Sequence, residues 1–520
     1  MNSVGKILGV TLAGIVSLGC PAGATTTDPG VEAGISVEAL YNLAEEFRRN
    51  GASPENLQES ARIHADLVER GHAPSMHSLA LAHFRGQGVE LDRERAVELL
   101  RAAVAAGNIE SRVWLGRALM VIGGHGEEAY RILSMAVVDG MDGAEYHYAL
   151  GHVESRFEAL SNPEFGVELL SRLSAEGNPS ATYELATAYR RGTGTPVDGS
   201  RARLLFGSLV VAGDAQSAER LAEMLRDGEG GPQDLARAEA LFASAFENGR
   251  ASAGLKLAGV LLEVDRPAEA RAILVTAAEQ ESVDAQLQLA LGDISGAFGA
   301  ASRAQEGQEM LEMLVESSDP FTANRLARQA LRAELPKALD LEKIAATLDE
   351  AAQAGDGRSA ERLVRLLRIL PDWFENSLQR RSDALAAHGS LMAQRIYFDE
   401  SVRAILETER GRQAGALVVE LLADADPQGF EAGLLAAFAT SRNGYVYLLQ
   451  SELRRKGVYS GQLTGLADRA TLSAVMGYCR DHGLSALCAQ GPLRKDVASA
   501  LAVALSAPEA NARVEPSSDG

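Results

Sequence analysis

Residues 185–194 read LATAYRRGTG and residues 221–230 read LAEMLRDGEG. The two stretches lie 36 positions apart and share Leu-Ala, an apolar residue four positions further on, and Gly-x-Gly. The segments behind them repeat too, because Ala202 and Ala238 are again 36 positions apart and each has a glycine eleven residues later. A helix, a glycine-bearing turn and a second helix that return in register are typical of a helical-repeat solenoid. The sequence therefore predicts an all-α fold, a right-handed helical-hairpin solenoid.

The repeat register extends well beyond this pair. Each first helix carries a leucine followed by alanine or glycine, and a small residue beside a leucine lets two helices approach closely. These anchors are Leu79, Leu115, Leu150, Leu185, Leu221, Leu257 and Leu289. Gly-x-Gly is lost after residue 292, but helical periodicity continues. We therefore expect the solenoid over residues 37–440, with a loop or bend at 295–301.

The units resemble a known repeat family. The shared pattern is Ala-x-x-x-Leu-Ala/Gly, then Gly-x-Gly, then Asp-x-x-x-Ala, as in the run from His83 to Gly88 followed by Asp92 and Ala96. This pattern is similar to the Sel-like repeats, bacterial relatives of tetratricopeptide repeats, and it is closest over residues 73–250. The resemblance implies a scaffold that binds other proteins along the surface of the solenoid.

The N-terminus has the pattern of a secretory signal. Residues 1–24 contain one basic residue, an apolar stretch and Ala-Gly-Ala at the end, and residues 25–36 form a polar linker. Cys20, behind Ser-Leu-Gly, resembles a degenerate lipoprotein box, so lipidation of Cys20 is an alternative to soluble export. Either route predicts a periplasmic protein. No stretch is long and apolar enough for a transmembrane span.

The composition changes near residue 441. Residues 441–505 look like the small three-helix peptidoglycan-binding domain, which has a Leu-Gln helix, a Gly-Tyr-x-Gly turn, a Thr-started helix and a Gly-Leu exit. On that resemblance the wall-binding candidates are Gln450, Tyr459, Gly461 and Thr464. Thr464-Gly465 stands where the family has Asp-Gly, and Tyr478-Cys479 stands where it has Phe-Gln. Residues 506–520 are expected to form a disordered tail.

Only two free thiols remain after export, because either route removes or modifies Cys20. Cys479 and Cys488 are close in sequence, and an oxidising compartment favours one disulfide between them.

Charge limits the partners. The formal net charge is −21, so nucleic acid is an unfavourable partner. Arg358, Arg362 and Arg365 nevertheless fall on one helical face. They predict either a groove for an acidic polysaccharide or acidic protein surface, or a solvated face with internal pairs to Glu361 and its neighbours.

Catalytic and metal-binding patterns were not found. The best-spaced histidines, His147 and His152, lack metal-ligand spacing, and no Gly-x-Ser-x-Gly nucleophile turn occurs. Gly192-Thr193-Gly194 follows a helix and recurs with the repeat, so it is not a phosphate loop. We expect no enzyme activity and no cofactor.

These patterns together predict a function. We expect an exported scaffold for protein–protein interaction in the bacterial envelope, tethered near the cell wall by residues 441–505. One alternative is a periplasmic scaffold for export of an alginate-like exopolysaccharide, similar to the repeat lipoprotein of alginate export. A second alternative is a wall-targeted accessory of a hydrolase.

Overall fold

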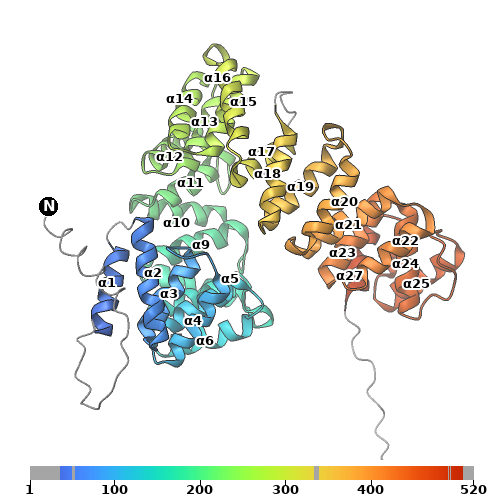
Figure 1. Ribbon diagram of the computed structural model, residues 1–520, viewed down its shortest axis with the longest axis horizontal. Helices are drawn as coiled ribbons and strands as arrows, with labels where there is room; N and C mark the ends of the chain where they lie inside the picture. The colour runs from blue at the N-terminus through green and yellow to red at the C-terminus, as the bar shows by residue number, and fades with distance from the viewer. Residues whose placement is uncertain (1–35, 50–52, 333–338, 490, 492, 508–520) are drawn as a thin grey trace, which may run out of the picture. The chain divides into compact units, whose positions relative to one another are not determined.

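Every regular element that the structure describes is helical (Figure 1). This computed structural model describes residues 36–49, 53–332, 339–489, 491 and 493–507. The signal peptide, Cys20, the linker up to residue 35 and the tail from residue 508 lie outside these residues. The chain divides into two units, residues 1–209 and 210–520, which are described separately. Among the described helices, none combines the length and the apolar character that crossing a bilayer requires.

The first unit is a stack of antiparallel helical hairpins (Figure 1). Helix α1 packs against α2, and each of α3, α5 and α7 packs against the helix that follows it and against the hairpin before it. The elements are α1 (Val37–Arg49), α2 (Pro54–Glu69), α3 (Ala73–Arg85), α4 (Arg93–Ala105), α5 (Ser111–Ile122), α6 (Gly126–Val138), α7 (Ala144–Val153), η1 (Glu158–Leu160), α8 (Pro163–Ala175), α9 (Pro179–Arg191) and α10 (Gly199–Val211), which ends at the boundary between the units.

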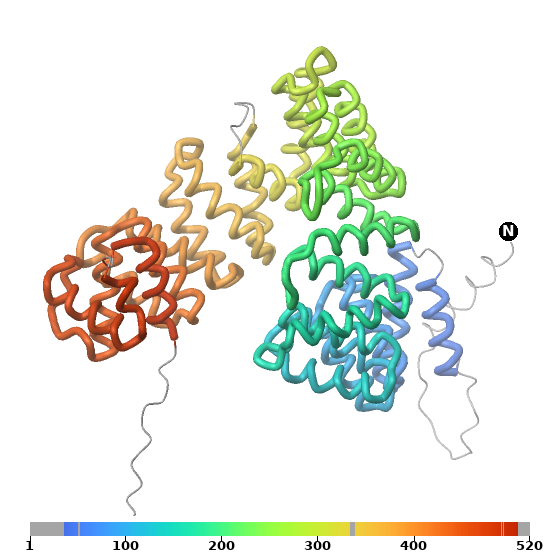
Figure 2. The backbone as a smooth tube through the Cα atoms, turned by 180° about the vertical axis from the view of Figure 1, so that it is seen from behind, coloured from blue at the N-terminus to red at the C-terminus, as the bar shows by residue number. Residues whose placement is uncertain are grey.

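The second unit continues the same architecture and ends in a helical cluster (Figure 2). Its hairpin helices are α11 (Ala215–Asp227), α12 (Leu235–Glu247), α13 (Ala251–Glu263), α14 (Pro267–Glu279), α15 (Val283–Ser295), η2 (Gly299–Ala301), α16 (Ala304–Glu316), α17 (Pro320–Ala330), α18 (Leu341–Gln353), α19 (Gly357–Ile369), η3 (Pro371–Trp373), α20 (Ser377–His388), η4 (Gly389–Leu391), α21 (Gln394–Thr408), α22 (Gly411–Leu422) and α23 (Pro427–Thr440). The last helices are α24 (Arg442–Arg455), α25 (Arg469–Asp481), α26 (Ser485–Cys488) and α27 (Lys495–Ser506). The predicted helical-hairpin solenoid is confirmed, and the bend expected at 295–301 is the turn that contains η2.

The Gly-x-Gly motif has a different physical role at each glycine. Gly192 ends α9 with a left-handed backbone (φ 74°), and its N–H donates to the carbonyl of Ala188. Gly194 also has a positive φ (67°), and a Cβ there would lie 2.3 Å from the carbonyl oxygen of Pro163. Pro163 begins α8 in the preceding hairpin. The first glycine therefore caps a helix, and the second lets two repeats meet backbone to backbone.

The anchor leucines form the interior of the hairpin stack. Six of the seven are at most 6% exposed: Leu79, Leu115, Leu185, Leu221, Leu257 and Leu289. Leu150 differs, because it is only partly buried. In the helix that contains Leu150, the residue in close contact with a neighbouring segment is Gly151. A Cβ at Gly151 would lie 2.0 Å from the ring of Phe157.

The C-terminal segment does not have a core of its own. Helices α24, α25 and α27 share one hydrophobic cluster with α21, α22 and α23, including Leu434, Ala437, Leu448 and Leu501, which are all at most 1% exposed. The segment after residue 440 is therefore packed as the end of the solenoid. Its removal would expose the apolar faces of α22 and α23.

Candidate functional site

Two successive first helices, α17 and α19, present arginines at matching repeat positions. Arg325 on α17 and Arg362 on α19 are 37 positions apart, and so are Arg328 and Arg365. The first helices α15, α17 and α19 contact one another in that order. The same repeat position places these guanidinium groups in rows on one face of the second unit.

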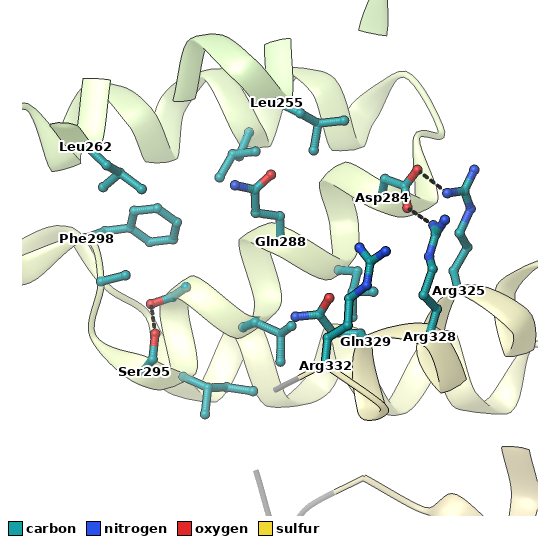
Figure 3. A pocket seen from close by; sticks show the side chains of 16 residues that line it. Leu255, Leu262, Asp284, Gln288, Ser295, Phe298, Arg325, Arg328, Gln329 and Arg332 are labelled. Carbon is teal, nitrogen blue, oxygen red and sulfur yellow. Dashed lines mark hydrogen bonds and ion pairs between the residues drawn. The ribbon is translucent and has the colours of Figure 1, made fainter. Parts of the chain in front are cut away.

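The larger cavity on this face has a volume of about 870 Å³. Its apolar part is formed by residues from α13, α15 and the turn after α15, including Leu255, Leu262 and Phe298 (Figure 3). Its polar side is formed by four residues from α17 and the turn after it: Arg325, Arg328, Gln329 and Arg332. The cavity therefore combines an apolar subsite with a cationic edge.

One carboxylate of the protein already occupies part of this edge. Asp284, near the start of α15, lies 3.0 Å from Nη1 of Arg325 and 3.5 Å from Nη2 of Arg328 (Figure 3). All three side chains remain about one-third exposed. The guanidinium groups are thus held in place and are still accessible from solvent.

A second cavity of about 370 Å³ continues from the first. Arg325 and Arg328 line both cavities, and Arg358, Arg362 and Arg365 from α19 line the second. We call the two cavities together the arginine groove; its six arginines are Arg325, Arg328, Arg332, Arg358, Arg362 and Arg365.

The arginines of α19 have not formed the internal pairs expected as one alternative. Glu361 instead accepts a hydrogen bond from the backbone N–H of Ala393 at 3.0 Å. Within the described residues, Arg358, Arg362 and Arg365 form no ion pair, and Nε of Arg362 is buried without a hydrogen-bond partner. The fourth arginine of α19, Arg368, pairs with Glu400 and does not line the groove.

Burial and repulsion between cations both act on Arg362. Its burial, followed by the charges of Arg365 and Arg328, lowers the pKa of this guanidinium. Such a group gains from an incoming carboxylate, because the anion replaces lost hydration and offsets the repulsion.

The cavity floor and Asp284 were not identified from the sequence. The available signal was the 37-residue spacing between α17 and α19. The same spacing places Gln288 and Leu291 on α15 at the repeat positions that Arg325 and Arg328 occupy on α17. No local pattern shows that Leu255 and Phe298 meet at one cavity.

Near the C-terminus, the wall-binding candidates hold one another in place. Gln450 is fully buried; its side-chain oxygen accepts from the N–H groups of Thr464 and Gly465, and its amide donates to Thr471 at 2.8 Å. Tyr459 is 5% exposed and donates its hydroxyl to the carbonyl of Gln462. These polar atoms organise the loop between α24 and α25.

Gly461 and Thr464 lie in the same loop and are partly buried. Gly461 packs on the ring of Tyr459, and the hydroxyl of Thr464 accepts from the N–H of Leu466. Among the apolar side chains of this loop, Leu466 is the most exposed, at 59%.

The expected disulfide is present. Cys479 on α25 and Cys488 on α26 are bonded, and both are fully buried in the cluster shared with α21 to α23. The bond closes the turn between the two helices.

The histidines considered for metal binding have other surroundings. Burial lowers the pKa of His147 to about 4, and Nδ1 of His152 accepts a hydrogen bond from the N–H of Asn162. In the part of the chain that the structure describes, no three His, Cys, Asp or Glu side chains gather as metal ligands.

The comparisons with known proteins agree with the fold. The family model described as Sel1 repeat matches residues 73–108, 179–208 and 215–249. No curated protein matches the chain.

Two solved structures illustrate the likeness. The crystal structure of c5321, a protective antigen of uropathogenic Escherichia coli with an SLR fold, is 17% identical over 88% of this chain and 95% of that chain, with a TM-score of 0.35. A Sel1 repeat protein from Oxalobacter formigenes is 20% identical over 56% of this chain and 87% of that chain, with a TM-score of 0.36. Superpositions at this level carry no functional argument. Three segments of the chain, all between residues 73 and 249, match the Sel1 repeat model.

Proposed function

We propose that this protein is a non-catalytic scaffold that binds other proteins in the bacterial envelope. Sel1 repeats are generally non-catalytic and suited to protein–protein interaction. The observation that carries the proposal is the arginine groove, an accessible surface built from successive first helices of the repeats. Such a surface suits a partner that crosses several hairpins.

Photocrosslinking in cells tests the scaffold proposal. A benzophenone amino acid would replace an exposed side chain on a first helix, Val121 on α5 or Phe321 on α17. The controls are exposed side chains on second helices, Leu204 on α10 and Leu378 on α20. We expect discrete protein adducts from first-helix positions only. Equal labelling at all four positions, or none, would contradict the proposal.

Export to the periplasm is part of the proposal. It is supported by the leader-like residues 1–24 and by the buried disulfide, since disulfides persist in oxidising compartments. Mass spectrometry of the mature N-terminus separates the two routes. Cleavage after Ala24 indicates soluble export, and a diacylglyceryl group on Cys20 indicates a lipid anchor. Cellular protein that keeps an intact Met1 would contradict export.

A tether to the cell wall completes the proposal. Because residues 441–505 share a core with α21 to α23, the test uses the full chain, sedimented with purified peptidoglycan sacculi. Leu466→Ser should weaken sedimentation while the bonds of Gln450 stay in place. The exposed pair Arg410→Gln and Arg412→Gln is the control. A chain that stays in the supernatant at low salt has no such tether.

A further inference from the structure

We propose that the arginine groove binds an extended acidic peptide of a partner protein, with an apolar side chain of that peptide in the larger cavity. This inference rests on the proposed scaffold function and names the chemistry of the partner.

Charge complementarity is the first argument. The groove is lined by six arginines and by three carboxylates, Asp284, Asp356 and Glu361, so it is net positive in a chain whose formal net charge is −21. Asp284 pairs with two of the arginines, and the α19 arginines of the groove have no acidic partner among the described residues. Guanidinium groups bind carboxylates in a two-pronged geometry, so unpaired arginines in a cavity favour carboxylate ligands.

The spacing of the helices predicts the spacing of the acids. Packed helices lie about 8–10 Å apart, and an extended chain advances about 3.3 Å per residue. Helices α17 and α19 are direct neighbours, so their arginine rows match carboxylates about three residues apart. Helix α15 is the next neighbour on the other side, and its cavity would receive an apolar side chain about three residues further along.

The apolar cavity favours a peptide over a polysaccharide. Leu255, Leu262, Leu291 and Phe298 line a space of about 870 Å³ beside the arginines. A leucine or phenylalanine side chain of the peptide would fill part of this space, and its transfer out of water would favour binding. A polyuronate carries carboxylates but has no apolar side chain for the cavity.

Arg362 is the residue whose loss should matter most. Its Nε is buried without a hydrogen-bond partner, and Arg365 lies one helical turn further on. A carboxylate entering between α17 and α19 would meet the guanidinium groups of Arg328, Arg362 and Arg365, because all three line one cavity.

The test is fluorescence anisotropy with the purified full chain and a labelled peptide of about 12 residues. The peptide has one phenylalanine, a glutamate about three residues later and a second glutamate about three residues after that. Comparison peptides replace both glutamates by glutamine, or the phenylalanine by serine. A fourth probe is an oligouronate with matched charge.

We expect saturable binding of the first peptide that weakens as salt rises, because ion pairs are screened. Arg362→Gln with Arg365→Gln should lower its affinity at least tenfold. The control, Arg410→Gln with Arg412→Gln, changes the net charge equally at exposed arginines of the same unit and should leave the affinity unchanged. Each comparison peptide should bind at least tenfold more weakly, and thermal melts would show that every variant is folded.

Three results would overturn the inference. The first is the absence of saturable binding of the first peptide. The second is an equal loss of affinity for that peptide in the two arginine double variants. Binding of the oligouronate in preference to the peptide is the third, and it would assign the groove to an acidic polysaccharide. In each case, an adduct from the Val121 crosslinker would show that the scaffold function stands without this groove.

Discussion

The second glycine of the repeat motif makes a sharp prediction, because the chain provides a matched control. Gly194→Ala adds one methyl group at a positive φ (67°), 2.3 Å from the carbonyl oxygen of Pro163. Gly177→Ala, in the same unit, adds the same group at φ 89° with nothing within 4 Å. Both changes strain the backbone, and only the first forces two repeats apart.

The magnitudes follow from these surroundings. A left-handed backbone costs a residue with a Cβ about 1–2 kcal/mol, and loss of flexibility in the unfolded chain offsets about 0.4–1 kcal/mol of it. Both terms cancel in the comparison. The contact at Gly194 involves backbone that cannot rotate away, and overpacking of this kind costs about 1–3 kcal/mol. Gly194→Ala should therefore be about 2 kcal/mol more destabilising than Gly177→Ala.

Urea unfolding and thermal melts measure the difference. At about 2–4 °C per kcal/mol for a unit of this size, the midpoint of Gly194→Ala should lie about 4–8 °C below that of Gly177→Ala. Hydrogen exchange should locate the loss at the contact between the turn after α9 and the start of α8. Equal stability of the two variants would refute the account of the motif as a contact between repeats.

Further predictions concern the interior, the disulfide and pH. Leu221→Asp places a carboxylate at a site that is 2% exposed, so we expect a loss of at least about 3 kcal/mol and faster limited proteolysis; an unchanged melt would mean that Leu221 is not a packing anchor. Replacing Cys479 and Cys488 by alanine should cost about 2–3 kcal/mol, and alkylation after unfolding without reductant should find both native thiols blocked. Because burial lowers the pKa of His147 to about 4, the unfolded chain binds its proton first as pH falls below about 6.5. Stability should thus decline between about pH 6.5 and 4, and His147→Asn should lessen that decline; an identical pH profile would contradict it.

The hairpins can be predicted from the sequence because the residues that specify each of them lie close together in the chain. The Leu-Ala anchors, the Asp and Asn residues that cap helix N-termini and the glycines that cap helix C-termini each act within one or two helical turns. The structure shows Asp92, Asn178 and Asp234 accepting hydrogen bonds from the first turns of their helices, as such residues do. The repeat length then brings each buried face to the next, so the solenoid follows from a pattern that can be read in one dimension.

The anchors also show where this reading fails. Leu150 occupies the anchor position in the sequence but is only partly buried, because Phe157 from the following turn packs onto Gly151. A repeat pattern specifies which position faces inward on average. A bulky neighbour on a nearby turn changes which residue fills the space.

The candidate sites divide in the same way. The sequence by itself determined the repeat architecture, the cysteine pairing and the arginine row of α19, since each depends on residues close together in the chain. Only the tertiary structure decided that Arg325 and Arg328 join that row around an apolar cavity, and that Gln450 is buried in a loop network. It also decided that α24 to α27 share a core with α21 to α23. The physical reason is that burial and the meeting of separate helices depend on how whole hairpins pack, and no single helix encodes which neighbour will cover it.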